Sequence, residues 1–323
     1  MKNRSAITIA IIFTVIIAST ASTAYGQSTQ VANAETATIN AYNAITEAHQ
    51  AGADTTQLIE QLNTALNLTS QAKQAQTNNP QEAETLANQA IEIAQNVTQQ
   101  AHTAQQTAEN TLPIAAITTA SALVVAGIAI YFLGPKIYWN IWLKLRKNYR
   151  LNTKKTSPNK NALVITAEQI CAIALALTVI LALISVSGLI LPTNRGEQFS
   201  ELGILGPNMK LGDYPSKIVS SETIHLYGYV GNQMGQPMYY TVMVKLGDNN
   251  TAVNPANTDS INQYSQVLDS NQSWTFPIDL TLTKVGDNQR VLFELWIYNQ
   301  TINQNQYHER WGQIWLNVTS PAT

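Results

Sequence analysis

The chain has 323 residues, of which 45% are hydrophobic and only 12% are charged. The charged fraction is well below the one-quarter or so that is typical of soluble domains. The formal net charge of −2 gives the chain no excess of basic residues with which to bind nucleic acid. A single cysteine, Cys171, excludes a disulfide framework and a cysteine-based zinc cluster. The composition and the scattered histidines therefore predict no nucleic-acid partner, no cofactor and no metal site.

Residues 1–26 have the pattern of a secretory signal peptide. Lys2 and Arg4 precede an apolar run, and the small residues Ala24 and Gly26 form a cleavage site before Gln27. The alternative is an uncleaved anchor, because the apolar run is just long enough to span a bilayer. In both cases the basic end stays inside and the following segment is expected outside the cell.

Residues 27–111 contain eight acidic residues and one basic residue, and they predict an Ala/Gln-rich helical bundle or coiled-coil rod. Gly52 and Pro80 divide the segment into three helices, and Asn79 with Glu82 provides a start signal for the third. An alanine-rich face buries little apolar area. We therefore expect a thin extracellular rod that unfolds separately from the rest of the chain.

Two further apolar stretches, 112–133 and 169–191, have the length of about 20 residues that crosses a bilayer, and they predict two transmembrane helices. Between them, residues 135–166 carry eight Lys or Arg residues and no acid. The positive-inside rule then places the basic loop, 134–168, in the cytoplasm. Its candidate contacts with anionic lipid or a partner are Lys144, Arg146, Lys147, Arg150, Lys154 and Lys155. The predicted protein is a multi-pass protein of the cell membrane with extracellular N- and C-terminal domains.

The N-glycosylation motifs agree with this topology. Outside the signal, N-x-S/T occurs at Asn67, Asn96, Asn249, Asn271, Asn299 and Asn317. All six positions lie in segments expected outside the cell, and none lies in the basic loop. The sequence therefore predicts a surface glycoprotein.

Residues 192–323 differ sharply in composition, since the part from residue 193 holds fifteen of the 24 aromatic residues. Short alternating runs separated by Gly, Asn, Asp and Pro are typical of strands. The predicted strands are 199–205, 223–230, 239–246, 274–282, 290–298 and 310–318. This number of strands in about 130 residues favours an antiparallel, immunoglobulin-like β-sandwich.

A family resemblance appears in the same region. The residues FSELGILGPN at 199–208, followed by GDYP at 212–215, resemble the opening of an archaeal membrane-protein family known as domain of unknown function sixteen-sixteen. The strands around 227–232, 239–246 and 292–296 also fit that family, and the resemblance covers about residues 165–323. It implies an archaeal surface membrane protein, but it assigns neither an activity nor a site.

Period-two alternation identifies a candidate binding face. In the last strand Ile314, Leu316 and Val318 are expected in the core, which leaves the tryptophans on the opposite side. By the same alternation in the preceding strand, the outward aromatic residues of the two strands are Trp296, Tyr298, Trp311 and Trp315. An aromatic surface is typical of a contact site, here for glycan or peptide. The alternative is that a loop, the rod or the lipid headgroup layer covers this face.

Catalysis is not expected. His308-Glu309-Arg310 lacks the spacing of a zinc-protease motif, and no P-loop, dinucleotide fingerprint or nucleophile elbow occurs. The sequence favours a non-enzymatic cell-surface scaffold or binding protein, whose partners are the lipid bilayer and surface glycans or envelope proteins. Two alternatives remain open: a sensor or receptor that signals through the basic loop, and an accessory subunit of a membrane enzyme complex.

Overall fold

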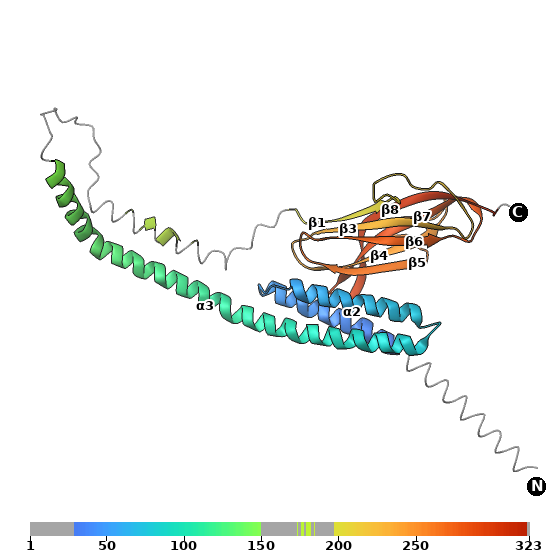
Figure 1. The fold of residues 1–323 in the computed structure, drawn as a ribbon, viewed down its shortest axis with the longest axis horizontal. Helices are drawn as coiled ribbons and strands as arrows, with labels where there is room; N and C mark the ends of the chain where they lie inside the picture. Colours follow the sequence, from blue (N-terminus) through green and yellow to red (C-terminus); the bar gives the residue numbers. More distant parts are fainter. Residues whose placement is uncertain are drawn as a thin grey trace, which may run out of the picture. The chain divides into compact units, whose positions relative to one another are not determined.

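The computed structural model describes residues 29–149 and 197–321, together with a few positions between 173 and 184. Figure 1 shows the order of the helices and strands along the chain. The chain divides into two compact units. The first combines the residues up to Ala108 with those from Gly196 onward, and the second is Glu109–Arg195. The predicted signal peptide, 1–26, lies outside the described residues.

Three helices follow one another in the N-terminal half, at residues 29–50, α2 at Thr56–Ala75 and α3 at Pro80–Tyr149. Gly52 ends the first helical region with φ of 87°, a conformation that favours glycine. At the start of α3, the Glu82 N–H donates to Asn79 Oδ1 at 3.4 Å, and Asn79 Nδ2 donates to Glu82 Oε2 at 2.9 Å. This reciprocal cap confirms the predicted start of the third helix.

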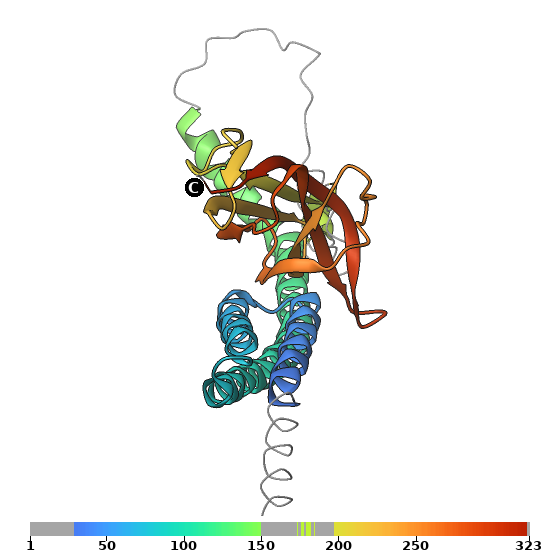
Figure 2. The same cartoon turned by 90° about the vertical axis from the view of Figure 1, so that its right-hand side faces the viewer.

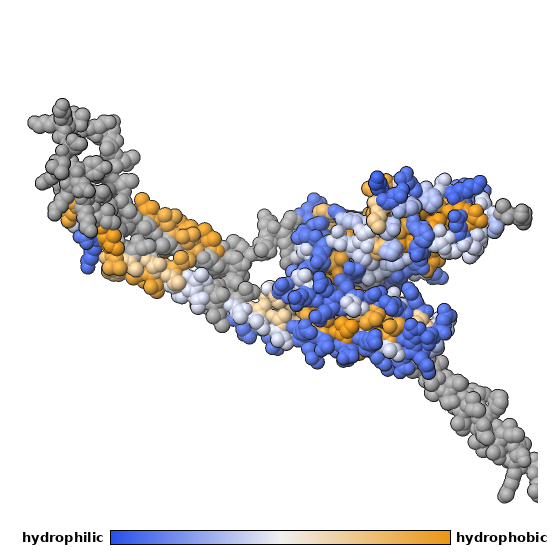
Figure 3. Space-filling view, in the orientation of Figure 1, coloured by the Kyte–Doolittle hydropathy of each residue, from blue (hydrophilic) through white to orange (hydrophobic). Residues whose placement is uncertain are grey.

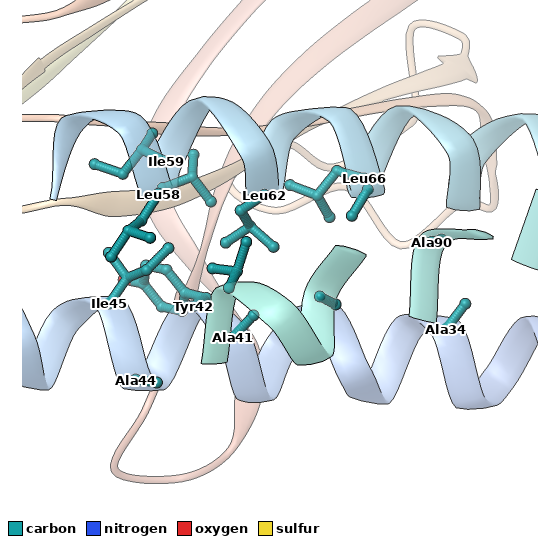
Figure 4. Close-up of a cluster of buried hydrophobic side chains, with 14 of the residues drawn as sticks. Ala34, Ala41, Tyr42, Ala44, Ile45, Leu58, Ile59, Leu62, Leu66 and Ala90 are labelled. Carbon is teal, nitrogen blue, oxygen red and sulfur yellow. The ribbon is translucent and has the colours of Figure 1, made fainter. Parts of the chain in front are cut away.

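The helical bundle, defined here as residues 29–108, is held together by small side chains. Figure 2 looks towards its three helices, and Figure 4 shows part of its core. Ile45 and Leu62 are fully buried between the first helix and α2. The buried stripe of α3 is mostly alanine, at Ala83, Ala87, Ala90, Ala94, Val97 and Ala101. Their alternating steps of four and three residues keep one narrow face of α3 inside the bundle.

The predicted first transmembrane helix, 112–133, is not a separate helix. It lies within α3, which starts among polar bundle residues and continues past Lys144, Arg146 and Lys147. Figure 3 shows apolar surface along this part of α3. Its exposed large apolar side chains are Val124, Val125, Ile128, Tyr131, Phe132, Leu133, Ile137, Trp139 and Leu143.

Within residues 29–149 and 197–321 and the few positions between them, no helix has both the length and the apolar character needed to cross a membrane. This finding contradicts the prediction of two transmembrane helices. Most of the second predicted span, 169–191, lies outside the described residues. The basic loop is corrected at its start, since Lys144, Arg146 and Lys147 belong to α3, while Arg150, Lys154 and Lys155 lie outside the described residues.

The C-terminal part of the chain is a β-sandwich, defined here as residues 199–319. Its strands are β1 Phe199–Leu205, β2 Lys217–Val219, β3 Thr223–Gln233, β4 Met238–Gly247, β5 Ser260–Leu268, β6 Ser273–Thr281, β7 Gly286–Asn299 and β8 Gln304–Thr319. They form a three-stranded sheet, β1-β3-β6, and a five-stranded sheet, β2-β8-β7-β4-β5. All described pairings are antiparallel except β2 with β8, which is parallel.

The sandwich core lies between the two sheets. From the five-stranded sheet it takes Val242 and Val244 of β4 and Phe293 and Leu295 of β7, all fully buried. Leu226 of β3 and Ile278 of β6 face them from the other sheet. Because side chains alternate along a strand, the neighbouring residues of β4, β7 and β8 lie on the outer face of the five-stranded sheet, away from this core.

The helical bundle packs on one end of that outer face. Tyr42 of the first helix is 2% exposed, and its ring lies 5.7 Å from Tyr239 of β4 and 6.1 Å from Tyr298 of β7. The Tyr42 hydroxyl also donates to the Pro237 carbonyl at 3.3 Å. One continuous buried cluster joins the bundle side chains to Val267 and Tyr298 of the sandwich. This shared cluster argues against the expectation of a rod that unfolds separately from the rest of the chain.

A polar contact strengthens this junction. Asn63 of α2 donates from Nδ2 to the Val267 carbonyl at 2.9 Å, and its Oδ1 accepts from the Val267 N–H at 2.8 Å. Val267 belongs to β5, which stands at the edge of the five-stranded sheet. The Asn63 amide thus satisfies both backbone groups of one edge residue, which an uncovered edge strand would leave free to pair with another chain.

Candidate binding surface on the five-stranded sheet

The outer face carries the aromatic residues of β7 and β8 that the sequence singled out. In the register of the two strands, Trp311 stands opposite Glu294 and Trp315 stands opposite Arg290. Ile314 and Leu316 of β8 are buried in the sandwich core, so Trp315 points to the other side. The ladder shifts between Leu295 and Trp296, where Glu309 has φ of 55°. This shift lies before Trp311, so Trp311 and Trp315 share one unbroken register and the same face.

At the bundle end of the face, the structure covers one of the predicted binding residues. Tyr298 is 7% exposed and packs among Tyr42 and Tyr239. Its hydroxyl donates to Asn303 Oδ1 at 3.4 Å. Burial raises the pKa of Tyr42, and it raises the pKa of Tyr239 to about 12. Tyr298 is thus part of the junction between bundle and sandwich, not of an open surface.

The middle of the face holds a buried ion pair that sequence reasoning missed. Lys245 Nζ of β4 lies 2.9 Å from Glu294 Oε2 of β7, and their side chains are only 8% and 1% exposed. Lys245 also donates to the Ala256 carbonyl at 2.7 Å, while the Ala256 N–H donates to Glu294 Oε1 at 2.5 Å. The pair therefore anchors the β4–β5 loop over the sheet. The sequence did contain a signal for this ion pair, because Lys245 and Glu294 are oppositely charged residues at outward positions of two strands that pair with each other.

Trp296 lies beside this pair and is half-buried. Its Nε1–H donates to Glu294 Oε2 at 3.3 Å, its ring lies 5.5 Å from Lys245 Nζ, and the Tyr307 ring is 5.6 Å away. A cavity of about 400 Å³ opens next to it, lined by Lys245, Pro255, Ala256, Asn257, Thr258, Asp259 and Trp296. Lys245 lines this cavity, but its charge is already neutralised by Glu294. The ion pair therefore provides no unpaired charge for a ligand in the cavity.

The far end of the face remains open. We call Arg290, Trp311 and Trp315 the tryptophan–arginine surface. Residues Trp311 and Trp315 are 39% and 37% exposed, and the guanidinium carbon of Arg290 lies 5.9 Å from the Trp311 ring and 5.1 Å from the Trp315 ring. Arg290 Nε donates to Gln313 Oε1 at 2.5 Å, and Nη1 donates to the Thr251 carbonyl at 3.0 Å. These neutral acceptors fix the cation between the two rings.

The predicted glycosylation sites differ in accessibility. Asn67, Asn96, Asn249 and Asn271 are exposed, whereas Asn299 and Asn317 are half-buried. Asn299 Nδ2 donates to Gln306 Oε1 at 2.7 Å, and Asn317 Oδ1 accepts from the Asn288 N–H at 2.8 Å. The side chains of the two half-buried asparagines are thus held by hydrogen bonds between β7 and β8.

Two other contacts between titratable side chains provide candidate catalytic or metal-binding groups. His225 Nδ1 and Asp279 Oδ1 are 2.6 Å apart, but both side chains are about two-thirds exposed, at 68% and 65%. His308 Nε2 lies 2.9 Å from Ser200 Oγ, which lies 2.7 Å from the Tyr240 hydroxyl, and burial lowers the pKa of His308. Among the described residues, no three His, Cys, Asp or Glu side chains gather as metal ligands.

Comparisons with known proteins found a match to one family model and low similarity to several solved structures. A comparison with curated proteins found no match. Among solved structures, a β-glucosidase from Listeria innocua is 15% identical, with 38% of this chain and 16% of that chain covered and a TM-score of 0.27. The CARDB domain of the PF1109 protein from Pyrococcus furiosus is 11% identical, with 40% and 96% covered and a TM-score of 0.27. The chain thus spans only a small part of the β-glucosidase.

The family comparison agrees with the resemblance noted in the sequence. The matched segment, residues 192–317, contains β1 to β7 and most of β8, whereas the helical bundle lies outside it. The β-sandwich part of the chain therefore matches the family described as Domain of unknown function (DUF1616), over residues 192–317.

Proposed function

We propose that this protein is a non-enzymatic binding or scaffold protein that holds glycan or protein partners through its tryptophan–arginine surface. The observation that carries the proposal is the pair of exposed indoles, Trp311 and Trp315, flanking Arg290. Large aromatic side chains and arginine dominate the energetics of binding surfaces. Elsewhere on the same sheet face, the bundle and the β4–β5 loop cover the aromatic residues.

The first test separates binding from folding. Trp311→Ala combined with Trp315→Ala is expected to change the melting temperature little, because the core of β7 and β8 consists of other side chains. A buried aromatic truncation would instead cost about 3–5 kcal/mol. The double variant should lose binding, with each ring contact worth about 0.5–1.5 kcal/mol. Thermal melts and titration with glycans and proteins that co-purify with the wild-type chain measure the two effects.

The proposed place of action is outside the cytoplasm. The support is the predicted signal peptide at residues 1–26 together with the six N-x-S/T motifs on both sides of the basic segment. A partner on the cell surface or in the envelope would meet the tryptophan–arginine surface there.

Surface labelling tests this location. In a Cys171→Ala background, a cysteine introduced by Asn250→Cys sits in the exposed β4–β5 loop. It is expected to react with a membrane-impermeant thiol reagent on intact cells as fully as after lysis. The Cys171→Ala chain without the new cysteine is the blank. Labelling that appears only after lysis would contradict an extracytoplasmic location.

A further inference from the structure

Arg290 carries a positive charge that no described carboxylate neutralises. The ion pairs among the described residues are Lys73–Glu35, His225–Asp279 and Lys245–Glu294, and Arg290 takes part in none of them. Its two hydrogen bonds go to the neutral oxygens of Gln313 and Thr251. A guanidinium has five N–H donors, so three of them remain for a ligand.

The surroundings do not favour polyanions in general. From residue 197 to residue 321 the sequence has eleven acidic residues against six Lys and Arg residues. The sandwich is therefore net negative, and long-range attraction cannot bring an arbitrary polyanion to it. An anionic ligand of the tryptophan–arginine surface has to be recognised locally, by the guanidinium and the two rings.

The two rings fix the shape of such a ligand. Trp311 and Trp315 are four residues apart on β8, which at about 3.3 Å per residue separates their attachment points by roughly 13 Å. Arg290 lies in register with Trp315 and within 6 Å of both rings. The surface is thus an extended strip with a flat apolar contact at each end and a planar cation between them.

We propose that this strip binds an acidic polysaccharide, a chain of sugar units that carry carboxylates. The inference rests on the proposed binding function and adds the ligand class. Sugar rings present flat C–H faces that pack on indoles, and a carboxylate on the same ring pairs with guanidinium through two parallel N–H···O bonds. An acidic peptide could pair with the guanidinium, but it has no regularly spaced flat rings to pack on Trp311 and Trp315.

The probe is polygalacturonate, and its fully methyl-esterified form is the matched control because it keeps the sugar backbone and removes the charge. Titration of the full chain is expected to show at least about tenfold tighter binding of the acid than of the ester. Arg290→Gln should erase this difference. Arg290→Lys should recover part of it, because it keeps the charge but loses the planar donor fork. Arg310→Gln removes an exposed arginine of the neighbouring strand β8 and should change nothing.

The possible results distinguish the binding function of the tryptophan–arginine surface from the acidic polysaccharide as its ligand. Equal binding of acid and ester that Trp311→Ala with Trp315→Ala abolishes would overturn the acidic ligand and leave the binding function standing. Polyglutamate that binds as tightly as polygalacturonate would overturn the sugar in favour of an acidic peptide. If neither polysaccharide binds and the tryptophan variants lose no co-purifying partner, both proposals fail. The comparison of acid with ester uses the wild-type chain, so it stands even if an Arg290 variant misfolds.

Discussion

Tyr42→Ala is expected to lower the free energy of unfolding of bundle and sandwich together, by about 3–5 kcal/mol. Truncation of a fully buried aromatic residue has a cost of this size, since it removes apolar contact and leaves a cavity. Here the lost ring is the one that touches both Tyr239 and Tyr298, and the cavity would open at the junction. The variant therefore tests whether the two parts are one cooperative unit.

The measurement compares two probes on the full chain. Circular dichroism at 222 nm follows the helices, and near-ultraviolet dichroism follows the packed aromatic residues. We expect coincident transitions in the wild type and a common shift in Tyr42→Ala. Tyr42→Phe is the matched control, because it removes only the hydroxyl that bonds Pro237 at 3.3 Å and should cost about 1 kcal/mol. Two separate transitions in the wild type would contradict the single unit.

Local signals predicted much of this fold. Gly52 and the Asn79–Glu82 pair marked helix ends because capping depends on residues within one turn. Strand β1 was predicted with the bounds it has, Phe199–Leu205. Strand β5 was missed because its sequence, SINQYSQVL, is that of a polar edge strand with no clean alternation. The three-residue strand β2 is too short to carry a pattern.

Alternation predicted which way the tryptophans point, but not what lies over them. Tyr298 and Trp311 both point to the outer face, yet the bundle buries the first and leaves the second open. That difference depends on Tyr42, more than 250 positions earlier in the chain than Tyr298. The transmembrane prediction rested on the hydropathy of single windows, and it did not foresee that 112–133 lies inside the longer helix α3.

Glu294→Gln is expected to destabilise the sandwich by about 3–5 kcal/mol, because it leaves the Lys245 ammonium buried without a counter-charge. The substitution is close in shape, and the glutamine Oε1 still accepts from the Ala256 N–H. The loss therefore reports the charge and not the packing. Lys245→Met should cost a similar amount, since the Glu294 carboxylate is then the unpaired buried ion.

The double variant Lys245→Met with Glu294→Gln tests whether the two side chains act as one coupled ion pair or contribute to stability independently. With neither charge present, no ion is left buried, and the double variant should be more stable than either single variant. Urea unfolding of the full chain, followed by tryptophan fluorescence, measures all four proteins of the cycle. Losses that simply add would mean that Lys245 and Glu294 are solvated separately, and that the loop at Ala256 is held by its own backbone bonds. A double variant near wild-type stability would show that the ion pair adds no net stability over two neutral side chains, and that each single loss comes from the charge left unpaired.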